Sequence, residues 1–95
     1  MTLRVLSMLG PLLETQADSV TVPALDGSLG ILRGHAPMIA ALGRGRVSYR
    51  LGDEAGTCPI LGGVLEVKDD IITILTDGDG PEGNTDNSIP GGKKG

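Results

Sequence analysis

The sequence predicts an all-β domain whose short strands are arranged as a sandwich or a barrel. Apolar and polar residues alternate along most of the chain, which is the spacing of a half-buried strand. Sixteen glycines and six prolines indicate frequent tight turns rather than long helices. With 95 residues, the chain has room for one small hydrophobic core.

That core must be built almost entirely from aliphatic side chains. The chain has no phenylalanine or tryptophan, and Tyr49 is its one aromatic residue. Cys58 is the single cysteine, so an internal disulfide is excluded. Its apolar neighbours in TCPIL favour a packed thiol over a reactive one. A core of this size predicts modest stability.

The first segment is interpreted as a strand followed by a turn. MTLRVLSMLGPLLE superficially resembles a signal peptide, but its apolar part is short and is interrupted by Ser7 and by Gly10–Pro11. A small-residue cleavage site is also missing. No stretch of the chain approaches the roughly 20 apolar residues that a membrane-spanning helix requires. We therefore expect no direct insertion into a membrane.

Alternation continues through the middle of the chain. SVTVP, residues 19–23, places its valines on one face, and RVSYRL does the same with Val47, Tyr49 and Leu51. Only residues 36–42 would also fit a helix, and they are too few for that assignment. Strands therefore remain the expectation throughout this region.

The last predicted elements form a hairpin. VLEVK and IITIL, residues 64–68 and 71–75, are joined by Asp69 and Asp70, and a two-residue connection suits a tight β-turn. IITIL has large apolar side chains on both faces. One face should therefore pack inside the domain, and a neighbour should cover the other.

The composition changes after Asp77. GDGPEGNTDNSIPGGKKG holds one large apolar residue, Ile89, among glycines, prolines and small polar groups. Such a segment cannot bury enough apolar surface to compensate for the entropy lost when it becomes ordered. The predicted organisation is one folded domain over residues 1–77 and a flexible tail over residues 78–95.

Charge and motif content exclude several functional classes. A net charge of −4 leaves no basic surface for a run of phosphates, so nucleic acid is not an expected partner. His35 is the single histidine, and no serine, cysteine or aspartate stands at a motif spacing from it. DGDG at 77–80 lacks the later ligands of a calcium loop, and GSLGILRG lacks the phosphate-loop pattern. We expect no catalytic residue, no metal site and no cofactor.

Apolar side chains next to the predicted turns are more numerous than a small interior accommodates. Some of them are expected to face a partner, and methionine suits such a surface because it adapts to an irregular contact. The residues concerned are Met8, Leu9, Leu12, Leu13, Met38, Ile39 and Leu42.

Three segments, taken together and in this order, resemble the amino-terminal domain of the epsilon subunit of F-type ATP synthases. They are SVTVPALDGSLGILRGHAPMIAAL, GRVSYR and GGVLEVKDDIITILTD. The resemblance extends from about Leu3 to Asp77. Its most specific parts are Gly30 with GHAP, residues 34–37, and GGVLEV, residues 62–67. It implies a flattened β-sandwich of about ten short strands in two sheets.

The resemblance also implies a mechanical role without an active site. In this family the domain belongs to the rotor, where it binds the gamma subunit and rests on the membrane-embedded ring of c subunits (the c-ring). Rotation driven by ions reaches the catalytic head through this joint. The implied location is the cytoplasmic face of a bacterial membrane, as a peripheral subunit.

Site residues follow from the resemblance by position. The loop expected to face the c-ring consists of Asp26, Gly27, Ser28 and Leu29. The surface expected to face gamma consists of Ser7, His35, Met38, Ile39, Ala40 and Leu42.

Three departures from the family pattern modify these expectations. Arg33 and Arg44 stand where the family commonly has proline, so looser turns are expected there. Ser28 stands where an acidic residue is frequent, so the c-ring contact should rely less on charge. Residues 78–95 cannot form the pair of carboxy-terminal helices that inhibits ATP hydrolysis in many members and binds ATP in some. We therefore expect neither nucleotide binding nor inhibition through helices.

Two alternatives come from other functional classes. A free-standing β-sandwich that binds a small ligand or glycan would need an aromatic platform or a concave polar pocket, and one tyrosine offers little for stacking. A hydrolase would need His35 beside an activated serine or cysteine.

Overall fold

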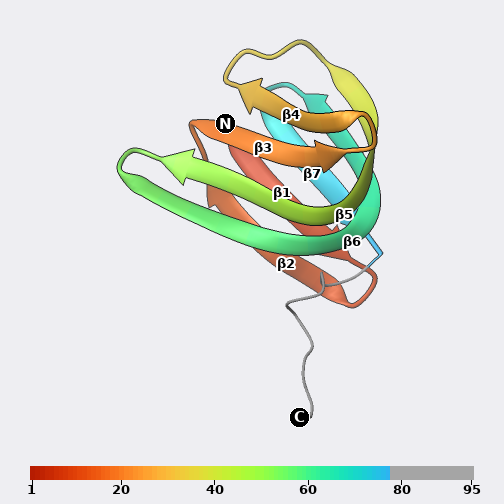
Figure 1. Ribbon diagram of the computed structural model, residues 1–95. Helices are drawn as coiled ribbons and strands as arrows, with labels where there is room; N and C mark the ends of the chain where they lie inside the picture. The colour runs from red at the N-terminus through yellow and green to blue at the C-terminus, as the bar shows by residue number, and fades with distance from the viewer. Residues whose placement is uncertain (78–95) are drawn as a thin grey trace.

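The computed structural model describes residues 1–77, which form seven strands and contain no helix (Figure 1). The all-β prediction is confirmed, and residues 36–42 contribute the beginning of a strand rather than a helix. The predicted tail, residues 78–95, lies outside the described residues. In chain order the strands are β1 (Thr2–Ser7), β2 (Gly10–Gln16), β3 (Ser19–Ala24), β4 (Gly27–Leu32), β5 (Met38–Leu51), β6 (Glu54–Lys68) and β7 (Ile71–Thr76).

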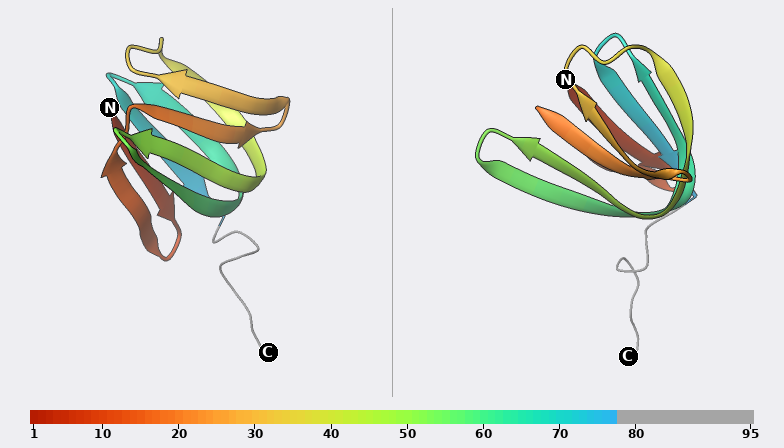
Figure 2. Two further views of the ribbon diagram at one scale, coloured as in Figure 1. Left: turned by 60° about the vertical axis from the view of Figure 1, so that its left-hand side comes forward. Right: turned by 45° about the horizontal axis from the view of Figure 1, so that its top comes forward.

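The seven strands form one continuous sheet in the order β2-β1-β7-β6-β5-β3-β4. All neighbours are antiparallel except β1 and β7, which are parallel. The sheet folds over into two layers because β5 and β6 curve strongly and pass from one layer to the other (Figure 2). The sandwich expectation is therefore confirmed, but with seven strands in one sheet rather than about ten in two. The difference arises because β5 and β6 continue around the bend, with 14 and 15 residues.

Glycines make this bend possible. The pairing of β5 with β6 runs from Leu42↔Gly63 to Arg44↔Leu61, so one residue pair is missing between them. Gly62 and Gly63 have φ angles of 80° and 142°, in a region that other residues rarely adopt. The irregular backbone increases the local twist and lets each strand turn into the second layer.

The core between the layers is aliphatic, as predicted from the composition. Cys58 is buried at its margin, in agreement with the packed thiol expected from the sequence. Tyr49 packs against the core with its ring over Gly56, its cross-strand partner, where a Cβ would overlap the ring. The largest fully buried side chains are Leu3, Val5, Val20, Val22, Ile31, Val47, Ile60, Leu65, Ile72 and Ile74.

The predicted hairpin is present as β6 and β7. Asp69 and Asp70, at its turn, have φ angles of 53° and 63°. Two consecutive positive φ angles identify a type I′ turn, whose twist matches that of the flanking strands. On β7, Ile72 and Ile74 are fully buried, as expected for one face. The expectation that a neighbour covers the other face is wrong within residues 1–77, because Leu75 is 56% exposed.

Candidate interaction surface

Strand pairing aligns the outward-facing side chains of four strands in one row. Ala41 on β5 pairs with Val64 on β6, Val64 with Leu75 on β7, and Leu75 with Leu6 on β1. Ile39 lies two residues before Ala41 on the same side of β5 and is 74% exposed. We call these five residues the outer apolar face.

The outer apolar face is the reverse side of the layer that covers the core. Leu65 and Ile74, which neighbour Val64 and Leu75 in sequence, are fully buried, so the exposed residues point away from the interior. Val64 is 48% exposed. Isolated exposed apolar residues are ordinary, but a contiguous row across four strands is typical of a surface that binds a partner.

The structure divides the predicted gamma-facing segment of β5 between two faces. Ile39 points outward, whereas Met38 and Ala40 are partly buried and pack against the core. Leu42 is 4% exposed and belongs to the core, so its assignment to a partner-facing surface is corrected. The reason is strand alternation, which turns every second side chain inward.

Ser7 and His35, also predicted to face gamma, lie near opposite ends of β1. Ser7 is the last residue of β1. The loop that contains His35 lies near the first residue of β1, because Gly34 N donates a hydrogen bond to Asp70 Oδ1 in the β6–β7 turn and Thr2 N donates to the Asp70 carbonyl. Five residue steps of a strand separate the two ends of β1 by roughly 17 Å. The structure therefore does not bring Ser7 and His35 together.

His35 is held by local hydrogen bonds. Its backbone N–H donates to the Leu32 carbonyl at 3.1 Å, and its ring Nδ1 lies 2.7 Å from the Ala36 carbonyl. Because a carbonyl can only accept, this contact places the proton on Nδ1. The half-buried ring thus stabilises the shape of its own loop.

The predicted c-ring loop lies at the β3–β4 turn. Asp26, Gly27 and Ser28 are exposed, whereas Leu29 turns inward and packs against the core. Leu25 N donates to the Ala41 carbonyl at 3.1 Å, which holds the turn next to β5. The loop and residues 38–41 together line an open groove of about 450 Å³. The structure therefore brings the predicted c-ring loop beside Ile39.

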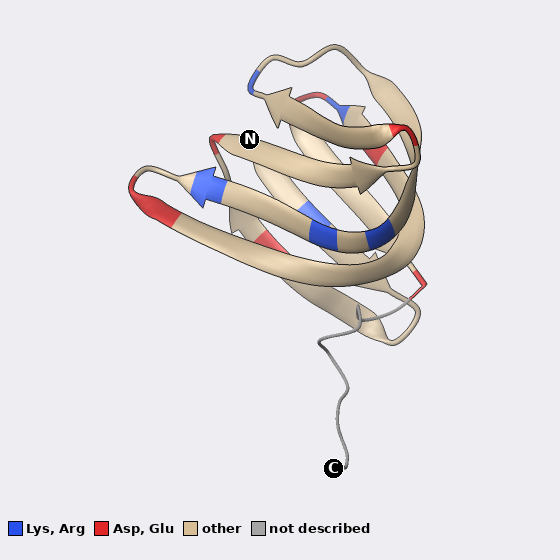
Figure 3. Cartoon of the chain, viewed as in Figure 1, with Lys and Arg blue, Asp and Glu red and all other residues tan. Residues whose placement is uncertain are grey.

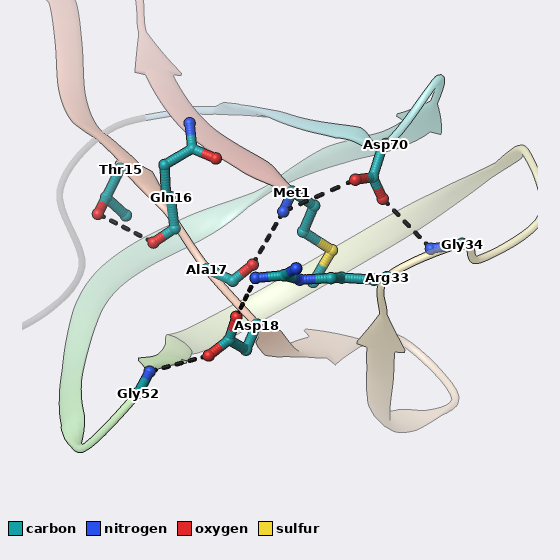
Figure 4. Close-up of polar contacts among 9 residues, drawn as sticks. All are labelled: Met1, Thr15, Gln16, Ala17, Asp18, Arg33, Gly34, Gly52 and Asp70. Carbon is teal, nitrogen blue, oxygen red and sulfur yellow. Dashed lines mark hydrogen bonds and ion pairs between the residues drawn. The ribbon is translucent and has the colours of Figure 1, made fainter.

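A polar network connects the loops at the other end of the sandwich (Figure 4). The Asp18 carboxylate accepts a hydrogen bond from Gly52 N at 2.8 Å and pairs with the Arg33 guanidinium. First the Gly52 N–H and then Arg33 lower the pKa of Asp18 below its ordinary value. Arg33, expected from the sequence to loosen its turn, thus forms an ion pair across to the β2–β3 connection.

A second part of this network involves Asp70. Its carboxylate lies 3.7 Å from the Met1 amine and accepts from Gly34 N at 3.2 Å. The Met1 amine also donates to the Ala17 carbonyl at 3.1 Å. These groups connect neighbouring segments of the backbone, so we assign them a structural role.

Residues 1–77 contain no group of three or more side chains that could hold a metal ion. Within the same residues, no helix could span a membrane. An open depression of about 510 Å³ lies over β3, β5 and β6, and its lining includes Thr21, Ser48 and Arg50. Val64 and Leu75 are exposed but are not among the residues that the sequence predicts to face a partner. For Leu75 a signal was present, because IITIL has apolar side chains on both faces and only one face can line the core.

Comparison with known proteins shows that this chain is similar in sequence to ATP synthase epsilon chains. One from Leptospira borgpetersenii serovar Hardjo-bovis is 42% identical over 66 residues, which cover 70% of this chain and 52% of the relative. One from a Nostoc species is 39% identical over 89 residues, which cover 92% of this chain and 64% of the relative. The chain thus spans between about half and two thirds of the length of these curated relatives.

Two solved structures share the fold. A chain of the Euglena gracilis mitochondrial ATP synthase (OSCP/F1/c-ring) has a TM-score of 0.76 and 23% identity, covering 88% of this chain and 54% of that chain. A chain of the Tetrahymena thermophila mitochondrial ATP synthase (central stalk/c-ring) has a TM-score of 0.67 and 17% identity, covering 81% and 63%. At these identities the similarity shows the fold alone.

The family assignment depends on a match that spans all of the described residues. Residues 1–78 match the family described as the β-sandwich domain of the ATP synthase delta/epsilon chain. The relatives and the two-layered fold agree with that match, and the resemblance seen in the sequence is confirmed. The chain belongs to the family of ATP synthase delta/epsilon chain β-sandwich domains.

Proposed function

We propose that this protein is a non-catalytic rotor subunit that joins the gamma subunit to the c-ring and couples ion translocation to ATP synthesis. The observation that supports it most directly is the outer apolar face, on a domain whose family consists of ATP synthase subunits. A protein that transmits torque needs firm contacts on two sides rather than a cleft for chemistry. The relatives named above come from bacteria, so we place the subunit on the cytoplasmic face of the cell membrane.

We assign the outer apolar face to gamma. Burying an exposed aliphatic side chain contributes roughly 1.5–3 kcal/mol, so Ile39, Val64 and Leu75 together supply a large part of a specific contact. The face has few charges around it: Glu66 lies beside Ile39 on the neighbouring strand, and Arg4 is paired with Glu14 at 3.7 Å. An apolar partner surface with a polar rim would match it.

We assign the exposed part of the β3–β4 turn to the c-ring. Asp26, Gly27 and Ser28 present a short polar loop, and Leu25 beside them is 69% exposed. Ile39 also lines the groove next to this loop, so the two proposed contacts adjoin. The two partners would therefore bind neighbouring parts of the domain, one at the β3–β4 turn and the other on β5.

The assignment to gamma is tested by Ile39→Asp in the full chain, co-expressed with gamma. A buried, unpaired carboxylate should weaken binding by about 100-fold or more, which corresponds to about 3 kcal/mol. Thr21→Asp is the matched control, because Thr21 is an exposed strand residue on the other layer. Co-purification that survives Ile39→Asp while circular dichroism shows an intact sheet would refute the assignment.

We also propose that the protein binds no nucleotide. Within residues 1–77 the ionisable groups that approach one another either belong to the loop network, as Asp18 and Arg33 do, or pair across β1 and β2, as Arg4 and Glu14 do, and none of these pairs lines a cleft. Titration calorimetry of the full chain with ATP tests the proposal. A binding isotherm with micromolar affinity would contradict it.

One observation favours a second candidate, the free-standing ligand-binding module. The open depression over β3, β5 and β6 presents hydroxyl groups next to Arg50, a combination that suits a small anionic or hydroxylated ligand. Thermal-shift screening with sugars and carboxylic acids distinguishes the candidates. A reproducible rise in Tm that Ser48→Ala abolishes would favour the module over the rotor subunit.

A further inference from the structure

Three arginines follow β5 through the second layer of the sandwich. We call Arg44, Arg46 and Arg50 the arginine stripe, and all three side chains are exposed. Figure 3 shows basic residues as blue segments along β5. The chain as a whole has a net charge of −4, so this run of cations is a local departure from an acidic composition.

The arginine stripe points away from the core. Val47, which follows Arg46, is fully buried, so the alternate residues on either side of it face outward. The cross-strand neighbours of the three arginines are small, apolar or hydroxylated, and none is acidic. On β6 they are Leu61, Pro59 and Ala55, and on β3 the neighbour of Arg50 is Ser19.

The two ends of the stripe lack a carboxylate partner within residues 1–77. The arginines that form ion pairs between described residues are Arg4 and Arg33, and neither Arg44 nor Arg50 takes part in one. The acidic Asp53 and Glu54 lie at the β5–β6 connection, beyond the end of the stripe. Both end guanidinium groups can therefore pair with a carboxylate from outside these residues.

Hydroxyl groups surround the Arg50 end of the stripe. Thr21, Ser48 and Thr57 line the open depression over β3, β5 and β6 together with Arg50. A hydroxyl can donate a hydrogen bond to a carboxylate, and such charge-assisted bonds are stronger than those between neutral groups. The depression thus adds donors for an acidic group to the charge of the stripe.

The dimensions of the stripe fit an extended segment rather than a single small anion. Side chains two residues apart on a strand are separated by about 7 Å, and the six residue steps from Arg44 to Arg50 span roughly 20 Å. An extended peptide with an acidic residue at every second position repeats its carboxylates at the same interval. A small anion would reach one part of the stripe only.

The composition of this face favours a protein segment over nucleic acid. Proteins that bind single strands combine cations with aromatic side chains on which the bases stack. Tyr49 is the one aromatic residue of the chain, and it packs against the core with its ring over Gly56. The net negative charge of the chain would also repel a polyphosphate that extends beyond the stripe.

We propose that the arginine stripe binds an extended acidic segment of a partner protein. Carboxylates of that segment pair with the arginines, and the hydroxyls of the depression donate further hydrogen bonds to it. The stripe lies on the layer opposite to the outer apolar face, so this site does not depend on the proposed contact with gamma. Both surfaces can be occupied at the same time.

A labelled peptide of about eight residues that alternates glutamate and serine tests the proposal. Titrated with the full chain at about 20 mM NaCl, it should bind, and about 0.5 M NaCl should weaken the binding because salt screens exposed charges. Fluorescence anisotropy measures the Kd. A peptide that alternates glutamine and serine should not bind, and binding of both peptides alike would contradict the proposal.

Variants of the chain locate the site. Arg50→Gln should raise the Kd for the glutamate peptide about threefold, and adding Arg44→Gln should raise it further, because each change removes one exposed charge pair. The matched control is Lys68→Gln, which removes an exposed cation from the other layer and should leave the Kd unchanged. If Lys68→Gln weakens binding as much as Arg50→Gln does, or if the glutamate peptide does not bind, the proposal is wrong.

Further outcomes separate this inference from other occupants and from the proposed function. Binding to phosphatidylglycerol vesicles or to an oligouridylate that is tighter than binding to the peptide and is lost in Arg44→Gln/Arg50→Gln would overturn the proposal. Ile39→Asp, which should abolish binding to gamma, should bind the glutamate peptide as the unmodified chain does. Failure of the stripe variants therefore leaves the assignment of the outer apolar face to gamma untouched.

Discussion

Gly63 is constrained by its conformation and by its surroundings. Its φ angle of 142° is unfavourable for any residue with a side chain. A Cβ at this position would overlap the carbonyl oxygen of Leu75 on the neighbouring strand. Backbone atoms cannot move aside as the end of a flexible side chain can, so the close approach of β6 and β7 here requires glycine.

Gly63→Ala should therefore lower the free energy of unfolding by about 2–4 kcal/mol. Urea denaturation monitored by circular dichroism measures the change. Gly30→Ala is the control, because its added Cβ would meet no atom within 4 Å and its φ is not positive. Equal stability of the two variants would show that the bend tolerates a side chain.

The Asp18 carboxylate predicts a dependence of stability on pH. Its pKa is lowered in the folded state, first by the Gly52 N–H and then by Arg33. A lowered pKa stabilises the fold at pH values above the ordinary pKa of an aspartate, about 4, and this contribution is lost as the pH falls through the folded-state pKa.

Asp18→Asn should thus destabilise the domain at pH 7 and have a smaller effect at pH 2–3. Chemical denaturation of both proteins at several pH values between 2 and 7 measures the difference. A difference that stays constant over this range would exclude the ionised carboxylate as its source.

Among the elements, β7 shows how one strand can serve the core and a partner surface. Ile74 is fully buried, and its neighbour Leu75 is 56% exposed on the outer apolar face. Stability and binding should therefore depend on different residues of the same strand.

Ile74→Val should reduce the free energy of unfolding by about 0.5–1.5 kcal/mol through a small cavity. Leu75→Ser should change it by no more than about 0.5 kcal/mol, as is usual for a surface position, and should weaken binding to gamma. Denaturation and calorimetry on both variants measure the two effects. If Leu75→Ser is the more destabilising change, this side of the strand serves the fold and not a partner.

The elements also show what the sequence could predict. The β6–β7 hairpin was predictable because its signal is local: two apolar runs joined by Asp69–Asp70. The bend was not predictable, because the need for glycine at position 63 comes from the neighbouring strand, where the carbonyl oxygen of Leu75 leaves no room for a Cβ.

The surface assignment of Leu42 was wrong because position in a family does not tell which face of a strand a residue occupies. Val64 and Leu75 form a surface with Ile39 only through the pairing of strands.

At the scale of the whole molecule, the sheet leaves one large apolar face outside the core. If gamma binds this face as we propose, its binding should stabilise the folded domain by about 2.7 kcal/mol when the partner is present at a concentration of 100 times Kd. Differential scanning calorimetry of the domain with increasing gamma should show a rising Tm. Ile39→Asp should abolish the rise, and a rise that persists in this variant would place the contact elsewhere.

The parallel pairing of β1 with β7 has a consequence for biosynthesis. Among the seven strands, β7 alone connects the β1–β2 hairpin to the rest of the sheet through backbone hydrogen bonds. A nascent chain therefore leaves the ribosome with its first hairpin unattached until residues 71–76 have emerged. The sheet can therefore close around its first two strands only after its last strand has been synthesised.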